Sequence, residues 1–162
     1  MRYESSVNAI SWRRFALLWA LVALPFAVGS LLVGSRATDT FLSHAVFHAV
    51  YPVVAASAIF VLLRLRSSVT ASRVMRGLFV ALIIVQAAVL LGHLGEEIAV
   101  LRHGAMAAPG SLFTAADHNF AAHVTVPGLL LSQLLLIATT ITAAILAWRT
   151  RRKLRLQAAS RS

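Results

Sequence analysis

The sequence predicts an all-α polytopic membrane protein, a bundle of four transmembrane helices with both termini in the cytoplasm. Two observations predict this fold class: four apolar stretches are long enough to cross a bilayer, and nearly all basic residues flank the same end of these stretches. The chain has 162 residues, of which 59% are hydrophobic and 12% charged, whereas soluble domains average about 25% charged residues. Most of the chain therefore faces lipid, and residues 1–162 have room for a single transmembrane domain.

Each apolar stretch supplies the roughly 20 residues that a transmembrane helix needs. The first follows two arginines and also resembles a signal peptide, but its apolar run is long and Val28-Gly29-Ser30 is a poor cleavage site. We therefore expect all four stretches to be retained as spans. They cover about residues 15–33, 41–63, 77–101 and 124–148.

The segment from about 104 to 123 is expected to form the longer loop, between the third and fourth spans. Residues 106–111 have the composition of a turn, and residues 112–123 are expected to form a short interfacial helix. Because Pro127 lacks a backbone N–H, we expect it to separate this helix from the fourth span or to kink the two against each other.

The basic residues orient the bundle. Only Arg36 and Arg102 lie away from the side of the termini, which leaves 13 of the 15 basic residues on that side. The positive-inside rule places this side in the cytoplasm, so we expect a protein of the cytoplasmic membrane whose loops 34–40 and 104–123 face the periplasm or the cell exterior. The net charge of +10 does not indicate nucleic-acid binding, because these residues flank apolar runs; the expected partner is the lipid bilayer.

The titratable side chains gather at the outer ends of the spans, where all six histidines and four of the five acidic residues fall. At about 1.5 Å per residue, His48 lies roughly 24 Å along its helix from Arg64. His93 lies roughly 26 Å from Arg76, so both histidines are in the outer margin of a hydrocarbon core about 30 Å thick. The residues at this side are His44, His48, His93, His103, His118, His123, Asp39, Glu96, Glu97 and Asp117.

Helical spacing gives several of these side chains a common face. His44 and His48 are four residues apart, and both Glu96 and Glu97 lie within one turn of His93. Inward-facing His and Glu from several helices build metal sites in bundles. The predicted core ligands are His48, His93, Glu96, Glu97 and His123, with His44 and His118 as outer candidates and Glu96 or Glu97 as general base.

Each of these groups also has an ordinary interpretation, because polar side chains near a helix end often face headgroups or water. Adjacent carboxylates near a membrane are costly unless they are solvated, paired or bound, which favours a metal or catalytic site. Since the chain has no Cys, its imidazole and carboxylate groups suit Zn, Fe or Mn. Haem held by a pair such as His48 and His93 is a less favoured alternative.

The segment Gly92-His93-Leu94-Gly95-Glu96-Glu97 matches the signature that names the HXXEE family, which comprises bacterial integral membrane proteins of about this size and of unknown function. The resemblance also implies an Asn-then-His element, and Asn119-Phe-Ala-Ala-His123 resembles one. No clear further His-x-x-x-Asn element is present, and His44-x-x-x-His48 stands where one is expected. The resemblance implies that these positions are important for function, but it does not imply a particular reaction.

Two functions remain open on the sequence alone. The first is a membrane metalloenzyme at the outer interface, whose lipid-like or small apolar substrate enters sideways from the bilayer. The second is a non-catalytic, haem-binding or accessory subunit of a larger membrane complex. A metal carrier is disfavoured, because Gln86 and Gln133 lie near mid-membrane and nothing ionisable lies below them. The substrate, the metal and a homo-oligomeric state are not specified by the sequence.

Overall fold

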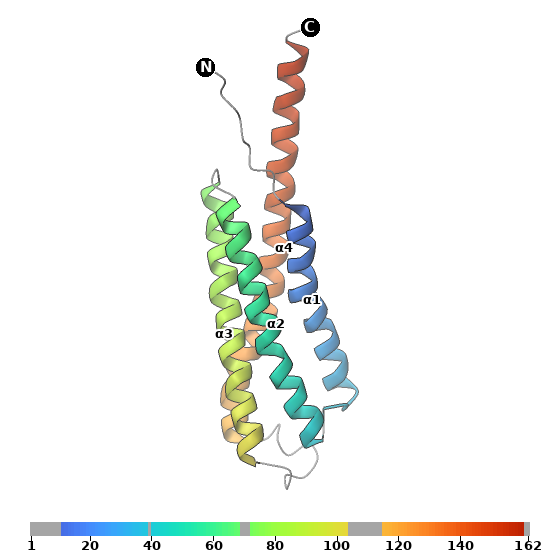
Figure 1. Cartoon of the computed structure of the whole chain (residues 1–162), viewed down its shortest axis with the longest axis vertical. Coiled ribbons are helices and arrows are strands. Elements are labelled where there is room, and N and C mark those ends of the chain that lie inside the picture. The colour runs from blue at the N-terminus through green and yellow to red at the C-terminus, as the bar shows by residue number, and fades with distance from the viewer. Residues whose placement is uncertain (1–10, 39, 69–71, 104–114, 161–162) are drawn as a thin grey trace.

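A computed structural model describes residues 11–38, 40–68, 72–103 and 115–160 of the chain (Figure 1). Four helices account for almost all of these residues, and each is long and apolar enough to cross a membrane. The predicted all-α, four-helix bundle is therefore confirmed. The helices are α1 (Trp12–Gly34), α2 (Phe41–Ser68), α3 (Arg73–His103) and α4 (Ala116–Ala159).

Helix α4 begins earlier in the chain than the sequence indicates. Residues 116–123, which we assigned to the outer loop, form its first two turns, and the helix continues through Pro127. Proline inside a membrane helix is tolerated because neighbouring groups satisfy the carbonyl that it leaves free. The remainder of that predicted loop, residues 104–114, lies outside the described residues.

The helices pack as a ring in which each contacts its two neighbours along the chain and α4 closes back onto α1. Figure 1 shows that α1 begins and α4 ends at the same end of the bundle. We call this the basic end, because Arg64, Arg73 and Arg149 lie there. The opposite end, which carries His44, His93 and His118, is the histidine end.

The apolar core fills the half of the bundle nearer the basic end. There α1 is joined to α4 by two hydrogen bonds, from Trp19 Nε1 to Thr140 Oγ1 at 2.9 Å and from Gln133 Nε2 to the Val22 carbonyl at 3.2 Å. Interhelical hydrogen bonds of this kind help to hold membrane helices together, where lipid provides no hydrophobic drive. The buried core residues are Phe15, Leu18, Val22, Ala58, Val61, Leu62, Leu65, Met75, Phe79, Leu82, Leu136 and Ala143.

Helices α3 and α4 approach most closely along a line of small residues that leads to the histidine end. A Cβ atom added at Gly92 would lie 3.2 Å from the Thr125 backbone nitrogen, and one added at Gly128 would lie 2.8 Å from a Val89 methyl group. Small residues allow such close approach between membrane helices. This contact fixes the rotation of α3 against α4, and hence which side chains of each point inward.

Candidate metal site at the histidine end

The inward faces of α3 and α4 carry polar side chains in line with the core. On α3 the buried positions alternate at steps of three and four residues through Gln86, Val89, His93 and Glu96, which is the spacing of a helix face packed against partners. The same spacing continues along α4 to His118 near its first turn. The core stripes of the two helices therefore carry histidine and glutamate near this end of the bundle.

Five of these side chains meet in a buried group that we call the donor cluster. Helix α2 contributes two of them one turn apart, α3 two and α4 one, and each residue is no more than 4% exposed. Helices α2 and α4 lie opposite each other in the ring, and their long side chains meet in its interior. The donor cluster consists of His44, His48, His93, Glu96 and His118.

The first half of the donor cluster is a three-histidine group. The Nε2 atom of His44 lies 3.0 Å from that of His118 and 3.0 Å from that of His48, and the His48 and His118 Nε2 atoms are 3.3 Å apart. The three nitrogens therefore form a nearly equilateral triangle, and these three residues can together hold a metal ion.

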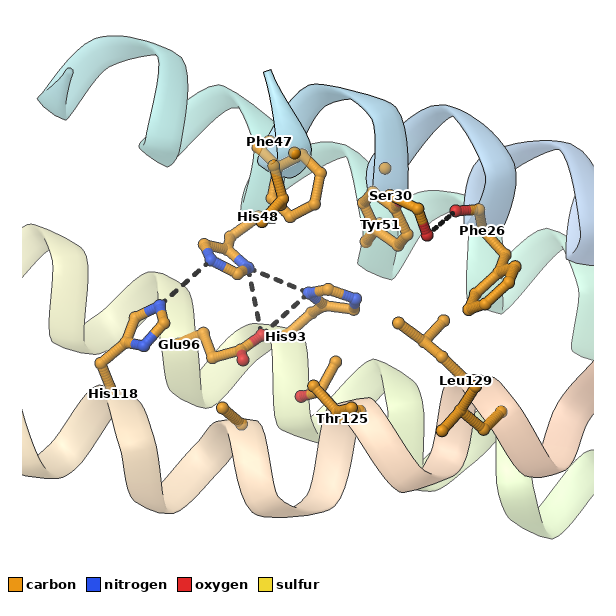
Figure 2. Close-up of a pocket in the computed structure, with 16 residues that line it drawn as sticks. Phe26, Ser30, Phe47, His48, Tyr51, His93, Glu96, His118, Thr125 and Leu129 are labelled. Atoms are coloured by element: carbon orange, nitrogen blue, oxygen red, sulfur yellow. Dashed lines mark hydrogen bonds and ion pairs between the residues drawn. The ribbon is translucent and has the colours of Figure 1, made fainter. Parts of the chain in front are cut away.

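The second half is a His/Glu group that lies deeper in the bundle. Figure 2 shows the rings of His48 and His93 beside the Glu96 carboxylate. The two Nδ1 atoms are 2.9 Å apart, and Glu96 Oε2 lies 3.1 Å from His48 Nδ1 and 3.0 Å from His93 Nδ1. These three atoms form a second triangle and could also hold a metal ion.

Hydrogen bonding alone cannot satisfy the three-histidine group. Each ring nitrogen presents either one proton or one lone pair, so among its three mutually close nitrogens at least two must be of the same kind. At about 3 Å, two lone pairs or two N–H groups repel each other. A cation at the centre of the triangle removes the conflict, because every donor atom then points a lone pair at it.

The distances also suit a metal ion. With metal–nitrogen bonds of about 2.1 Å, a tetrahedral ion holds its ligand atoms about 3.4 Å apart. The observed separations of 2.9 to 3.3 Å need to open by a few tenths of an ångström. Within the described chain, Glu96 Oε2 accepts no well-directed hydrogen bond although two ring nitrogens lie close to it. The three-histidine group therefore fits a metal ion better than it fits a hydrogen-bond network, and the His/Glu group has the size to hold one as well.

A backbone carbonyl fixes the orientation of His44. Its Nδ1 lies 3.0 Å from the Thr38 carbonyl oxygen, which can only accept, so Nδ1 carries the proton and donates it. In the neutral ring, Nε2 then presents a lone pair to the three-histidine group. Metal-binding histidines characteristically donate their other N–H to a carbonyl or carboxylate in this way.

A cavity of about 540 Å³ adjoins the His/Glu group. Its wall is mostly apolar and comes from all four helices, with Phe26 on α1 and Leu129 on α4 at the far side from the cluster in Figure 2. Residues of α1 and α4 that line it, such as Val33 and Val126, are also exposed at the outer surface of the bundle. The cavity therefore opens between α1 and α4, where these two helices move apart in Figure 1.

Sequence reasoning missed Tyr51, which lines the same cavity. Its ring packs on that of His93 with 4.3 Å between the ring centroids, and its hydroxyl donates to the Pro25 carbonyl of α1. Tyr51 follows His44 by seven residues and His48 by three, so helical spacing places it on the same face as the two histidines. This spacing could have identified it from the sequence. His93 Nε2 is buried and has no hydrogen-bond partner among the described residues.

Two predicted ligands lie outside the donor cluster. Glu97 is half-buried, belongs to neither triangle and does not line the cavity. His123 is exposed on α4, where its Nδ1 donates to the Asn119 carbonyl at 2.6 Å. Five residues correspond to about 140° around a helix, so His123 cannot share the inward face of His118. As metal ligands, Glu97 and His123 stay predictions that no contact in the described chain supports.

His103 is also separate from the donor cluster. It donates to Asp117 Oδ1 at 3.0 Å, and both side chains are about two-fifths exposed, at 43% and 39%. This pair joins the end of α3 to the start of α4 at the surface.

The geometry does not suit haem between His48 and His93. Two metal–nitrogen bonds of about 2 Å on opposite faces of a porphyrin need roughly 4 Å between the ligating atoms. The two Nδ1 atoms are 2.9 Å apart, which leaves no space for the macrocycle between the rings.

Comparisons of the chain with known protein families, with curated proteins and with solved structures find no match. The resemblance to the HXXEE family therefore rests on the His93–Glu97 motif, the Asn119–His123 element, and the size and four spans of the chain.

Proposed function

We propose that this protein is a metal-dependent membrane enzyme that acts on a lipid-like or small apolar substrate at the outer interface of the cytoplasmic membrane. One observation carries the proposal: a buried His/Glu group lies at the inner end of an apolar cavity that opens sideways from the bundle. Structural metal sites are usually closed by four protein ligands, whereas catalytic ones keep a position open. Each group here supplies three donors.

The outer location of the site follows from charge. The basic residues of the described helices lie mainly at the basic end, and the positive-inside rule assigns that end to the cytoplasm. The donor cluster lies at the other end, so it faces the outer leaflet. A substrate from that leaflet enters without crossing the membrane.

Zn, Fe and Mn are the candidate metals, because two imidazoles and one carboxylate suit all three. When bound, such an ion supplies Lewis-acid activation of a water or of a substrate oxygen. His48 and His93 would hold and orient it through Nδ1. One oxygen of the Glu96 carboxylate faces these rings. The other oxygen is the candidate acceptor for a proton from water or substrate. Glu97 remains the alternative base suggested by the sequence.

The cavity supplies the binding energy for an apolar chain. Its volume of about 540 Å³ lies within the range of roughly 300 to 1,000 Å³ that ligand sites occupy. Phe26 and Leu129 line its apolar end, and Thr125 and Tyr51 lie nearer the histidines. The substrate therefore binds with its polar group at His93 and Glu96 and its apolar part between α1 and α4.

Metal analysis of purified protein tests the proposal. Protein extracted in detergent without chelator is expected to contain Zn, Fe or Mn in stoichiometric amount, and His93→Ala is expected to contain less metal than the wild type. His103→Ala is the matched control, because it removes a histidine at the same end that belongs to neither group. Wild-type protein that retains no transition metal, and takes up none when Zn, Fe or Mn is added, would overturn the proposal.

A further inference from the structure

The ring of His48 belongs to both halves of the donor cluster. Its Nε2 lies 3.0 Å from His44 Nε2 and 3.3 Å from His118 Nε2. Its Nδ1, on the opposite edge of the ring, lies 2.9 Å from His93 Nδ1 and 3.1 Å from Glu96 Oε2. One imidazole therefore presents each of its nitrogens to a different triangle of donors.

The two triangles cannot be served by one ion. The nitrogens of an imidazole point away from each other in the plane of the ring, so an ion bound at one edge is beyond bonding distance of the donors at the other. Each triangle has the size that a single small ion requires, as shown above. An ion in the His/Glu group alone leaves the mismatch among the three nitrogens of the other group.

We propose that the donor cluster holds two metal ions bridged by the ring of His48. This inference rests on the proposed function and deepens it. With bonds of about 2.1 Å on both sides of the ring, the ions lie roughly 6 Å apart, well beyond the about 3.5–4 Å of two-metal sites bridged by an oxygen ligand. To bind both ions, the His48 ring releases its single N–H proton to solvent and coordinates as an anion, so the bridge removes one positive charge from a buried site.

The two ions have different surroundings. The ion of the three-histidine group lies nearer the N-terminal end of α2; His118 of this group lines the cavity, whereas His44, held by the Thr38 carbonyl, does not. The ion of the His/Glu group is held by His93 and Glu96, which do line it. Every ligand of the deeper ion lines the cavity, so this ion is the better placed to meet substrate, and the shallower ion orients the His48 ring.

Metal stoichiometry tests this arrangement. Protein stripped with chelator, reloaded with Zn²⁺ and desalted is expected to hold two equivalents. His44→Ala removes a ligand of the shallower ion alone and His93→Ala a ligand of the deeper ion alone, so each is expected to retain one equivalent. His48→Ala is expected to lose both, and His103→Ala to keep both.

The outcomes separate the inference from the function on which it rests. If wild-type protein binds one equivalent, and either His44→Ala or His93→Ala abolishes it, the site is mononuclear and the bridge is refuted while metal binding stands. Failure of wild-type protein to bind Zn²⁺ refutes the proposed function itself. If His48→Ala does not fold, the other two variants still decide the matter.

A spectroscopic measurement gives an independent reading of the bridge. Two Cu²⁺ ions joined through an imidazole ring are magnetically coupled, so fully loaded wild-type protein is expected to show a weakened Cu²⁺ EPR signal. His44→Ala, with one ion, is expected to show the full signal of an isolated ion. Full, uncoupled signals from two equivalents in wild-type protein would contradict bridging by His48.

Discussion

The contact between Gly92 and Thr125 is expected to control the stability of the site. In Gly92→Ala, the new methyl group would overlap the Thr125 hydroxyl and would lie 3.2 Å from the Thr125 nitrogen and 3.3 Å from its Cα. Rotation of the Thr125 side chain can relieve the first contact, at the loss of its 3.2 Å hydrogen bond to the Ala121 carbonyl. The backbone contacts remain, so α4 has to move away from α3.

The magnitude follows from three contributions. Overpacking of this kind costs about 1–3 kcal/mol, and the lost hydrogen bond costs about 1 kcal/mol. Replacement of a helical glycine by alanine returns up to about 1 kcal/mol. The free energy of unfolding of Gly92→Ala should therefore fall by about 1–3 kcal/mol. Displacement of α4 also moves His118, so the metal content should fall as well.

Thermal unfolding followed by circular dichroism in detergent measures this effect. Gly77→Ala is the matched control, because it lies on the same helix and nothing approaches its added Cβ within 4 Å. The control should be unchanged or stabilised by up to about 1 kcal/mol, and Gly92→Ala should melt several degrees lower, at about 2–4 °C for each kcal/mol. Equal stability of the two variants would refute the close packing of α3 on α4.

Three further changes test separate parts of the molecule. His123→Ala should leave the metal content unchanged, because this side chain is exposed; loss of metal would favour the assignment made from sequence. Trp19→Phe removes the hydrogen bond to Thr140 and should lower the free energy of unfolding by about 0.5–1.5 kcal/mol, with unchanged stability as the contrary result. In vesicles with photoreactive acyl chains, the buried Thr125 should be labelled in wild-type protein and protected in Ser30→Trp, which fills the cavity mouth. Failure to label Thr125 in wild-type protein would argue against lipid entry.

The number of helices and the end that carries the polar side chains could be predicted from the sequence, because both depend only on runs of apolar residues and their charged flanks. The choice between Glu96 and Glu97 could not be made from their spacing to His93, since both lie within one turn of it. The rotation of α3 decides it, and that rotation is set by the packing of Gly92 and Val89 on α4. From Phe79 onward, the buried positions of α3 follow one another at steps of three and four residues. This pattern places Glu96, and not Glu97, on the inward face.

The same reasoning explains His118 and His123. Their roles depend on where α4 begins, and the turn-like residues before 112 together with Pro127 suggested a break that the helix does not have. Once α4 is continuous, the inward stripe of Ser132, Gly128 and Thr125 extends back to His118. The contribution of the Thr38 carbonyl was beyond sequence reasoning, because a backbone atom leaves no trace in the residue type.

Helix α1 contributes no atom to either triangle of donors, although it forms one side of the cavity. Its hydrogen bonds to α4 lie between the middle of the bundle and the basic end, away from the donors that α2, α3 and α4 provide. Substitutions along the half of α1 nearer the histidine end can therefore reshape the cavity while the donor cluster stays in place. Under the proposed function, related sequences are thus free to diverge in the substrates that they accept while they retain the metal.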